Sequence, residues 1–167
     1  LHALTGLLGP VKRVTAMVAK AIDQFTIEDG PFAGKVVPVE VDDNWHLVLD
    51  FGDARLASLT TNSCVQDTLA PPLELYGLRG TIALDPIYVH KPVDVLRAGS
   101  DWEKVVLPQT GRARGPDHHL GIEHLVDCIQ NQSKPVLSID HAPHVVEILE
   151  QAAASSRAGQ TMTISST

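Results

Sequence analysis

The order of two kinds of sequence pattern is the feature that most constrains the fold. From residue 11 to residue 106 the chain is a series of short apolar and β-branched runs separated by glycine-containing turns. Downstream of these runs, apolar residues at helical spacing occupy 118–132 and 141–159. Grouped strands followed by grouped helices are typical of α+β domains, whereas alternation of the two indicates a parallel sheet. The pattern therefore predicts an α+β fold with a mostly antiparallel, open β-sheet and helices packed on one face.

The strand pattern is clearest in NWHLVLDFGDARLASLTTNSC, residues 44–64. Its first half alternates strictly, and one of the two alternating sets consists of Trp45, Leu47, Leu49 and Phe51. A period of two predicts a strand with one packed face and one partly wet face. Gly52 can adopt a positive φ, so Phe51-Gly52-Asp53 predicts a hairpin turn into a second strand. We place Cys64 in that second strand and expect its thiol to be buried.

Further strands are predicted downstream. Residues 73–86 form a hairpin pattern around Leu78-Arg79, and residues 93–99 and 102–108 follow as two short strands. By contrast, the segment TIEDGPFAGKVV, residues 26–37, contains two glycines and a proline and predicts a turn or loop.

The two helices have recognisable ends. Asp117 and Asp140 are the predicted N-caps, because a carboxylate can accept hydrogen bonds from the free N–H groups of a first turn. Cys128 lies on the apolar stripe of the first helix, and its thiol is expected to be buried. Gly159 is the predicted C-cap of the second helix, and residues 160–167 predict a final edge strand.

The first eight residues predict the downstream half of a helix. Leu1, Leu4, Leu7 and Leu8 share one helical face. Gly9-Pro10 is a stop signal, because glycine accepts the left-handed cap and proline cannot continue a helix. We expect the upstream half of this helix to lie outside the chain.

Composition argues against two classes of partner. The formal net charge is −7 and the basic cluster is confined to residues 112–114, so no nucleic-acid partner is expected. No apolar run approaches the ~18 residues that span a bilayer, so no membrane partner is expected. Two cysteines do not make a disulfide framework, which favours a reduced, cytoplasmic setting.

Histidine is the unusual residue, with eight copies, while GxGxxG, P-loop, CxxC and HExxH motifs are missing from the sequence. His118 and His119 precede a predicted helix, where they could contact an anionic or hydroxyl-rich ligand. They could equally be exposed first-turn residues beside an N-cap, and both interpretations stay open. A metal site is disfavoured, because these histidines lack the i, i+4 spacing of convergent helical ligands.

The remaining candidates have structural interpretations. His141 and His144, at the start of the last helix, are predicted to be surface or helix-cap residues. His46 either lines a pocket on the open side of the sheet or is solvated. The pair Asp42-Asp43 predicts turn chemistry, and Trp102 predicts a packing or interface residue.

Four stretches resemble, in their order and spacing, the C-terminal domain of the Gfo/Idh/MocA oxidoreductase family. They are LLGPVKRVTAMV, DGPFAGKVVPVEVDDNWHLVLDFGDARLASL, PPLELYGLRGTIAL and GIEHLVDCIQNQSKPVLSIDHAPHVVEILEQAAASSRAGQTM. Together they cover nearly the whole chain. The segment LLGPVKRV and the end Ser155-Ser156-Arg157-Ala158-Gly159 are the most telling parts.

The resemblance implies that residues 1–167 are a single C-terminal substrate-binding and oligomerisation domain, truncated at its N-terminus. In this family an N-terminal Rossmann domain binds NAD or NADP and holds a catalytic lysine in an EKP motif. The C-terminal domain helps to close the substrate site, and its open sheet face commonly mediates oligomerisation. The full-length protein is thus expected to be an NAD(P)-dependent dehydrogenase of a sugar, cyclitol or related polyol and a homo-oligomer. The chain alone is not expected to bind NAD(P) or to be active.

The same resemblance limits which site residues can be assigned. The family's DxxxH acid/base pair falls about one helical turn before His2, outside the chain, so no catalytic residue is assigned. His2, one turn later on the same helix face, is a candidate substrate contact. His118 and His119 are the other candidates, because family members often bring substrate-facing side chains to the penultimate helix. Two alternatives remain: a non-catalytic domain that dimerises through its sheet face, and a metal-dependent hydrolase.

Overall fold

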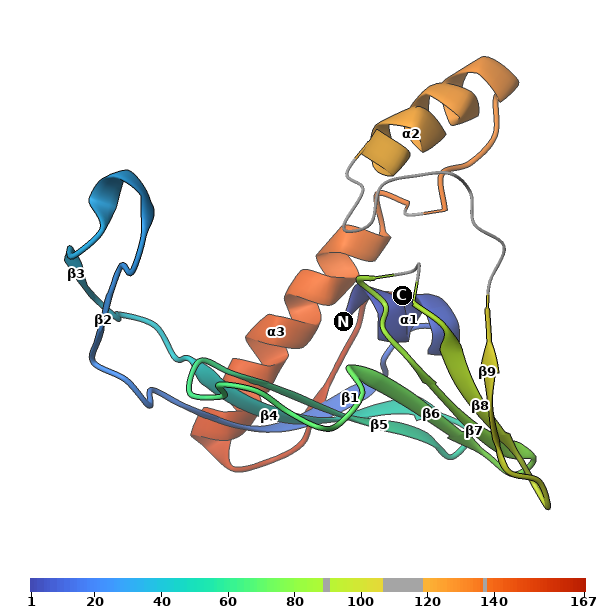
Figure 1. The fold of residues 1–167 in the computed structure, drawn as a ribbon, viewed down its shortest axis with the longest axis horizontal. Helices are drawn as coiled ribbons and strands as arrows, with labels where there is room; N and C mark the ends of the chain where they lie inside the picture. Colours follow the sequence, from blue (N-terminus) through green and yellow to red (C-terminus); the bar gives the residue numbers. More distant parts are fainter. Residues whose placement is uncertain (89–90, 107–118, 137) are drawn as a thin grey trace. The chain divides into compact units, whose positions relative to one another are not determined.

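A computed structural model describes residues 1–88, 91–106, 119–136 and 138–167 (Figure 1). The chain divides into two compact units, the first made of residues 1–66 and 137–167 and the second of residues 67–136. Every strand pair among the described residues is antiparallel. Together with the helices, these sheets confirm the predicted α+β class.

A four-stranded antiparallel sheet is the centre of the first unit. Its strands lie in the order β10-β1-β4-β5 and are β10 (Met162–Thr163), β1 (Arg13–Ala19), β4 (Asn44–Gly52) and β5 (Arg55–Asn62). Leu47 lies opposite Ala16 on one side and Leu59 on the other. The short β10 is an edge strand, as the sequence predicted.

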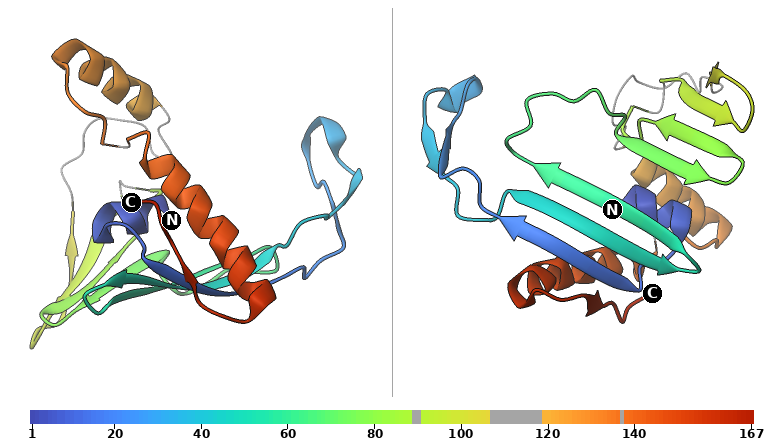
Figure 2. Two further views of the ribbon diagram at one scale, coloured as in Figure 1. Left: turned by 180° about the vertical axis from the view of Figure 1, so that it is seen from behind. Right: turned by 90° about the horizontal axis from the view of Figure 1, so that it is seen from below.

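The core of the first unit lies between this sheet and two helices. Both α1 (His2–Leu8) and α3 (His141–Ala158) lie on the same side of the sheet (Figures 1 and 2). The predicted alternation is confirmed, because the side chains that point toward the helices are at most 3% exposed at Leu47, Leu49 and Phe51. α3 contributes Ile148 and Ala152, each fully buried. Burial of this apolar surface is what stabilises the first unit.

The opposite side of the same sheet, which we call the outer face, is open within the first unit. Its side chains include Thr15 and Met17 from β1, Val48 from β4, and Leu56 and Ser58 from β5. Met17 is 79% exposed, Leu56 65% and Val48 52%. The outer face therefore presents apolar side chains among hydroxyls.

The turn between β4 and β5 is a tight hairpin turn with positive φ angles. Gly52, Asp53 and Ala54 have φ values of 80°, 52° and 59°. Positive φ at both central residues is typical of the type I′ hairpin turn, whose twist matches that of the strands. The predicted hairpin is confirmed, with its two-residue loop at Asp53-Ala54. The Asp50 carboxylate accepts a hydrogen bond from the Gly52 N–H at 2.8 Å, and this bond, followed by Arg13, lowers the pKa of Asp50.

A second, smaller hairpin extends from the sheet between β1 and β4. It consists of β2 (Gln24–Thr26), the 3-10 turn η1 (Gly30–Phe32) and β3 (Val36–Pro38). We call residues 23–41 the arm; it projects away from the four-stranded sheet in each view (Figures 1 and 2). The sequence predicted only a turn or loop over 26–37, and that was incomplete. The backbone on both sides of the glycine-rich tip pairs, with Phe25 opposite Val37.

The second unit is built on another four-stranded antiparallel sheet. Its strands follow chain order and are β6 (Leu73–Gly77), β7 (Gly80–Leu84), β8 (Val93–Arg97) and β9 (Trp102–Val105). The predicted hairpins are confirmed. Gly80, with a φ of 157°, permits close strand approach, because a Cβ there would lie 2.1 Å from the Leu96 carbonyl oxygen. Trp102 opens β9 and is 51% exposed.

The helix of the second unit, α2 (His119–Asn131), buries few of its apolar side chains. Cys128 is 4% exposed, which confirms the predicted burial of its thiol. The rest of the apolar stripe is at least 40% exposed, at Leu120, Ile122, Leu125, Val126 and Ile129. The predicted N-cap, Asp117, lies outside the described residues.

One local prediction was wrong, and another is confirmed only in its position. Cys64 is exposed and lies beyond β5, which ends at Asn62. The Asn62 side-chain oxygen accepts a hydrogen bond from the Cys64 N–H at 2.6 Å, so a turn replaces the continuing strand. Asp140 does precede α3, but it makes no side-chain capping bond to the first turn. Its backbone is already helical, with φ −77° and ψ −26°.

Within the described ranges, none of the helices is both long and apolar enough to cross a membrane.

Candidate functional site

Two helices of the first unit bring two histidines into contact. α1 positions His2 in its first turn, and α3 begins at His141. The His141 Nε2 and His2 Nδ1 atoms are 2.9 Å apart, and the two rings are stacked with centroids 5.0 Å apart. Thr5, one turn into α1, places its Oγ1 3.4 Å from the same Nε2. The three side chains form a polar cluster where the helices meet.

The chemistry of this cluster follows from its two imidazoles. A nitrogen–nitrogen distance of 2.9 Å requires that one ring donates a proton and the other accepts it. Desolvation is the main cause that lowers the pKa of His2, and the neighbouring His141 lowers it further. The lowered pKa favours a neutral His2 near physiological pH. A neutral histidine can both donate to and accept from a hydroxyl group.

His144 has a different role from the one predicted. It is 2% exposed, not at the surface, because position 144 shares the inward face of α3 with Ile148 and Ala152. The Val11 N–H donates to its Nε2 at 3.0 Å, so Nδ1 holds the proton and donates to Ser166 Oγ at 2.9 Å. Both ring nitrogens are therefore used in holding the chain together.

Glu147 extends this chain of hydrogen bonds. Its carboxylate accepts from the backbone N–H groups of Ser165 and Ser166 at 2.9 Å and 2.8 Å, and from both hydroxyls. These bonds, led by the Ser166 hydroxyl, lower the pKa of Glu147 to about 2. The C-terminal segment is thereby tied to α3.

The serines near the end of α3 complete the sheet edge. β10 pairs with only the first two residues of β1, so the later N–H groups of β1 need other acceptors. The Ala16 N–H donates to Ser155 Oγ at 3.0 Å, and the Val18 N–H donates to Ser156 Oγ at 2.9 Å. Gly159 then ends the helix in the left-handed conformation, with φ 64°. These bonds give a structural reason for the Ser-Ser-x-x-Gly pattern.

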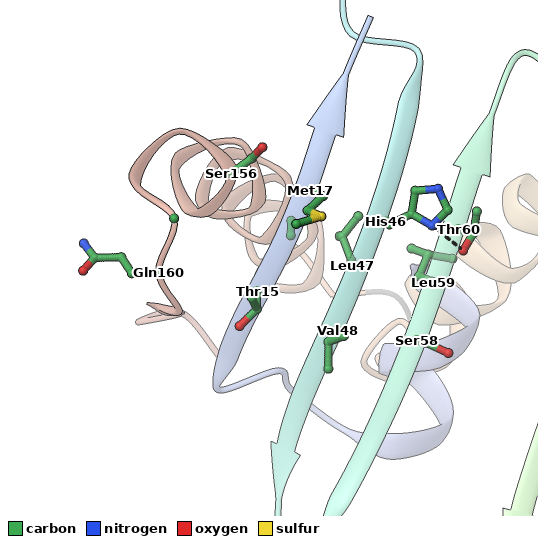
Figure 3. A pocket seen from close by; sticks show the side chains of 12 residues that line it. Thr15, Met17, His46, Leu47, Val48, Ser58, Leu59, Thr60, Ser156 and Gln160 are labelled. Atoms are coloured by element: carbon green, nitrogen blue, oxygen red, sulfur yellow. Dashed lines mark hydrogen bonds between the residues drawn. The ribbon is translucent and has the colours of Figure 1, made fainter. Parts of the chain in front are cut away.

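A shallow hollow of about 500 Å³ lies on the outer face of the sheet (Figure 3). Outward side chains that line it are Thr15, Met17, His46, Val48, Ser58 and Thr60. The His46 Nδ1 lies 3.3 Å from the Thr60 hydroxyl. His46 is exposed and also borders this hollow, so the structure does not separate the two interpretations left open for it.

The sequence of the whole chain identifies its family. The family model "Oxidoreductase family, C-terminal alpha/beta domain", of the Gfo/Idh/MocA group, matches residues 1–164. The chain belongs to this family. No curated protein sequence matches it.

Solved structures of similar fold are also oxidoreductases. They include an NAD binding oxidoreductase from Klebsiella pneumoniae (16% identity, TM-score 0.76), levoglucosan dehydrogenase in complex with NADH and L-sorbose (16%, 0.78) and an Agrobacterium radiobacter oxidoreductase in complex with NAD+, L-tartaric acid and magnesium (17%, 0.67). The matches cover 99%, 99% and 96% of this chain, but 48%, 48% and 45% of those chains. This oxidoreductase-family domain thus spans about half the length of the proteins it matches.

The predicted site residues of this family domain lie in different places. His2 is exposed in the first unit, within the histidine cluster. His119 is the exposed first residue of α2 in the second unit. His118 lies outside the described residues. In the described ranges, histidine, cysteine and acidic side chains do not gather in groups of three or more that could hold a metal ion.

Sequence reasoning missed the partners of His2. Thr5 and His141 are separated by 136 residues, and no local pattern connects them. The available signal was the density of histidines at the start of the last helix, His141-Ala-Pro-His144. Only the packing of α1 beside α3 shows which of the two faces His2. Asp43 does not make the local turn predicted for Asp42-Asp43: its carboxylate accepts the Ala21 N–H at 2.7 Å, from a residue 22 positions earlier in the chain.

Proposed function

We propose that this chain is the C-terminal, substrate-side domain of an NAD(P)-dependent oxidoreductase that acts on a sugar, cyclitol or related polyol. The observation that supports it most is the family match over residues 1–164. Levoglucosan dehydrogenase, of the same fold, has been solved with NADH and L-sorbose. The chain spans 48% of that protein, so a second domain of similar size is expected to provide the cofactor site.

The two domains of the full-length protein are proposed to have different roles. The nicotinamide cofactor, NAD or NADP, accepts or donates the hydride when it is bound to the other domain. This chain has no GxGxxG loop to hold a dinucleotide phosphate, so we expect it not to bind NAD(P) by itself. Its own part is to orient the substrate and to help exclude water from the reacting carbon. The full-length protein is proposed to be cytoplasmic.

His2 is the residue of the first unit best suited to contact a hydroxyl-rich substrate. It is exposed, and its pKa is lowered by desolvation and by His141. One of its ring nitrogens bonds to His141, which leaves the other ring nitrogen to meet a substrate hydroxyl. In the second unit, His119, together with His118, is retained as a proposed substrate contact.

The most direct test is to read the gene upstream of Leu1 and to assay the protein that it encodes. We expect a dinucleotide-binding domain there, and formation of reduced nicotinamide when the whole protein meets a panel of sugars, cyclitols and polyols. His2→Ala should raise KM for the preferred polyol more than it lowers kcat. Exposed Leu78→Ser is the matched control and should change neither. An upstream sequence without a dinucleotide-binding domain, or no turnover with any substrate of the panel, would contradict the proposal.

The open sheet suggests a second candidate function, which does not exclude the first. We propose that the chain forms a homodimer through its outer face, because Met17 and Val48 are 79% and 52% exposed at its centre. Met17→Glu combined with Val48→Glu should convert a dimer to a monomer in sedimentation equilibrium. A wild-type chain that stays monomeric at high concentration would rule this association out.

A further inference from the structure

The arm exposes more apolar side chains than its size explains. Phe25 is 49% exposed, Phe32 64%, Val36 49% and Val41 72%. Exposed apolar residues that occur singly are ordinary, but four within one short segment are more than a solvated hairpin needs. Two of the chain's three phenylalanines lie in this segment of 19 residues.

The arm has little internal support. Its two strands are three residues each, and the tip is closed by the Gly34 N–H, which donates to the Ile27 carbonyl at 2.8 Å. At the base, the Val39 N–H donates to the Asp23 carbonyl at 2.8 Å. An isolated two-stranded hairpin is marginally stable in water. A hairpin that projects from its own sheet therefore needs a second surface to become rigid.

The outer face offers a surface of matching chemistry. Its hollow of about 500 Å³ has Met17 and Val48 as apolar lining, and Thr15, Ser58 and Thr60 place hydroxyls around them. This volume lies within the range of roughly 300–1,000 Å³ that accommodates small organic groups. The thioether of Met17 adapts its shape and makes favourable contacts with aromatic rings. A phenylalanine side chain such as that of Phe32 suits this lining.

The arm does not reach the hollow of its own sheet. It leaves the end of β1, returns to the start of β4, and points away from the sheet in each view (Figures 1 and 2). The arm of the same chain therefore cannot fill the hollow. A second copy of this chain supplies both complementary parts at once, and in a two-fold dimer each contact is made twice.

The area needed by a stable dimer also favours participation of the arm. β1, β4 and β5 have seven, nine and eight residues. At a rise of about 3.4 Å and a spacing of about 4.8 Å, their outer face projects to roughly 400 Å². A stable interface buries about 800 Å² on each partner. The sheet alone supplies about half of that, and the arm is an exposed apolar surface of the same unit that could supply the rest.

We propose that the arm, residues 23–41, crosses to a second copy of this chain and inserts Phe32 into the hollow on the outer face of its partner. This inference rests on the homodimer proposed above and extends it by naming the contact. It does not depend on which reaction the full-length protein performs.

Disulfide trapping between two variants, each with one exposed cysteine, tests the contact directly. Both variants start from Cys64→Ser, because Cys64 is the exposed native thiol and Cys128 is buried. One then receives Ala33→Cys, beside Phe32, and the other Ser58→Cys, in the hollow. Mild oxidation of the mixture should give a covalent heterodimer within minutes. A Leu78→Cys variant mixed with Ser58→Cys is the matched control and should remain uncross-linked.

The strength of the contact is measured by the dimer dissociation constant. Phe32→Ser removes one buried ring from each of two symmetric contacts and should raise that constant by about 100-fold or more. Leu78→Ser, at a side chain exposed in a turn of the second unit, should change it less than about 3-fold. Far-UV circular dichroism spectra should be unchanged for both variants, since both side chains are exposed in the single chain and neither supports its fold.

Several outcomes would overturn the arm contact. Cross-linking that occurs only within one chain carrying both cysteines would show that the arm folds back on its own sheet. A dimer that Met17→Glu and Val48→Glu dissociate but Phe32→Ser leaves intact would show that the sheet associates without the arm. A monomeric wild-type chain would overturn the arm contact together with the homodimer. Each of these results leaves the oxidoreductase proposal to its own test, the upstream sequence and the polyol assay.

Discussion

α2 has a stronger apolar periodicity than α3, yet it buries fewer of its side chains. α3 packs on the inner face of its sheet and buries five residues, among them the polar His144 and Ser155. Among the described residues of α2, His119–Asn131, Cys128 alone is buried, and Ile122 and Ile129 are 65% and 70% exposed. The comparison teaches that an apolar stripe predicts a helix but does not say whether a partner covers the stripe. Three predictions test this difference, from the largest effect to the smallest.

Matched isoleucine substitutions in the two helices should show the largest difference in unfolding free energy. Ile148→Ala in α3 removes a side chain that is 0% exposed and leaves a cavity, so it should cost about 3 kcal/mol of unfolding free energy. Ile129→Ala in α2 removes one that is 70% exposed and should change the free energy by less than about 0.5 kcal/mol. Urea unfolding of both variants measures the difference. Equal losses would mean that the α2 stripe is covered after all.

The two helices also offer a matched pair of histidines. His144 Nε2 accepts the Val11 N–H at 3.0 Å in α3, and His124 Nε2 accepts the Val136 N–H at 3.0 Å in α2. His144→Ala leaves a buried N–H without an acceptor and should cost about 2 kcal/mol. His124→Ala frees an N–H that can reach water, so we expect a loss below about 1 kcal/mol. The same urea titrations decide this, and a larger loss for His124→Ala would reverse the order.

Acid should loosen α3 through Glu147. Its pKa is about 2 in the folded chain, below the ordinary value of 4.5, because four hydrogen bonds favour the carboxylate. A lowered folded-state pKa means that the stabilisation is present above pH 4.5 and is lost as the pH falls toward 2. Unfolding free energy measured over this interval should fall, and the fall should be smaller in Glu147→Gln. An identical slope in the variant would assign the acid sensitivity to other groups.

Much of the fold was predictable because its determinants are local. The period-two pattern of Leu47, Leu49 and Phe51 predicts which face of β4 is buried, and this prediction does not depend on which element covers that face. Gly52 and Gly159 mark positions of positive φ, so a hairpin turn and a helix end follow from single residues. Strand ends were less certain, and Cys64 was misplaced because the Asn62 side chain competes locally for its backbone.

The candidate site was predictable only in part. His2 was identified from its position on the first helix, but its partner His141 lies 139 residues away. Nothing in the spacing of the eight histidines distinguishes His141, which meets His2, from His144, which is buried and fully bonded. His141 and His144 lie in the same turn of α3 but have different roles, because their side chains point to different surroundings.

The sequence by itself determined the α+β class, most of the strands and the family, because periodicity, turn chemistry and the order of motifs are properties of neighbouring residues. The tertiary structure alone decided which histidines meet, which helix stripe is covered, and that residues 23–41 form a projecting arm. These features depend on contacts between residues that are distant in the chain. Burial, hydrogen-bond partners and exposed apolar surface come into existence only when α1, α3 and the sheet pack together.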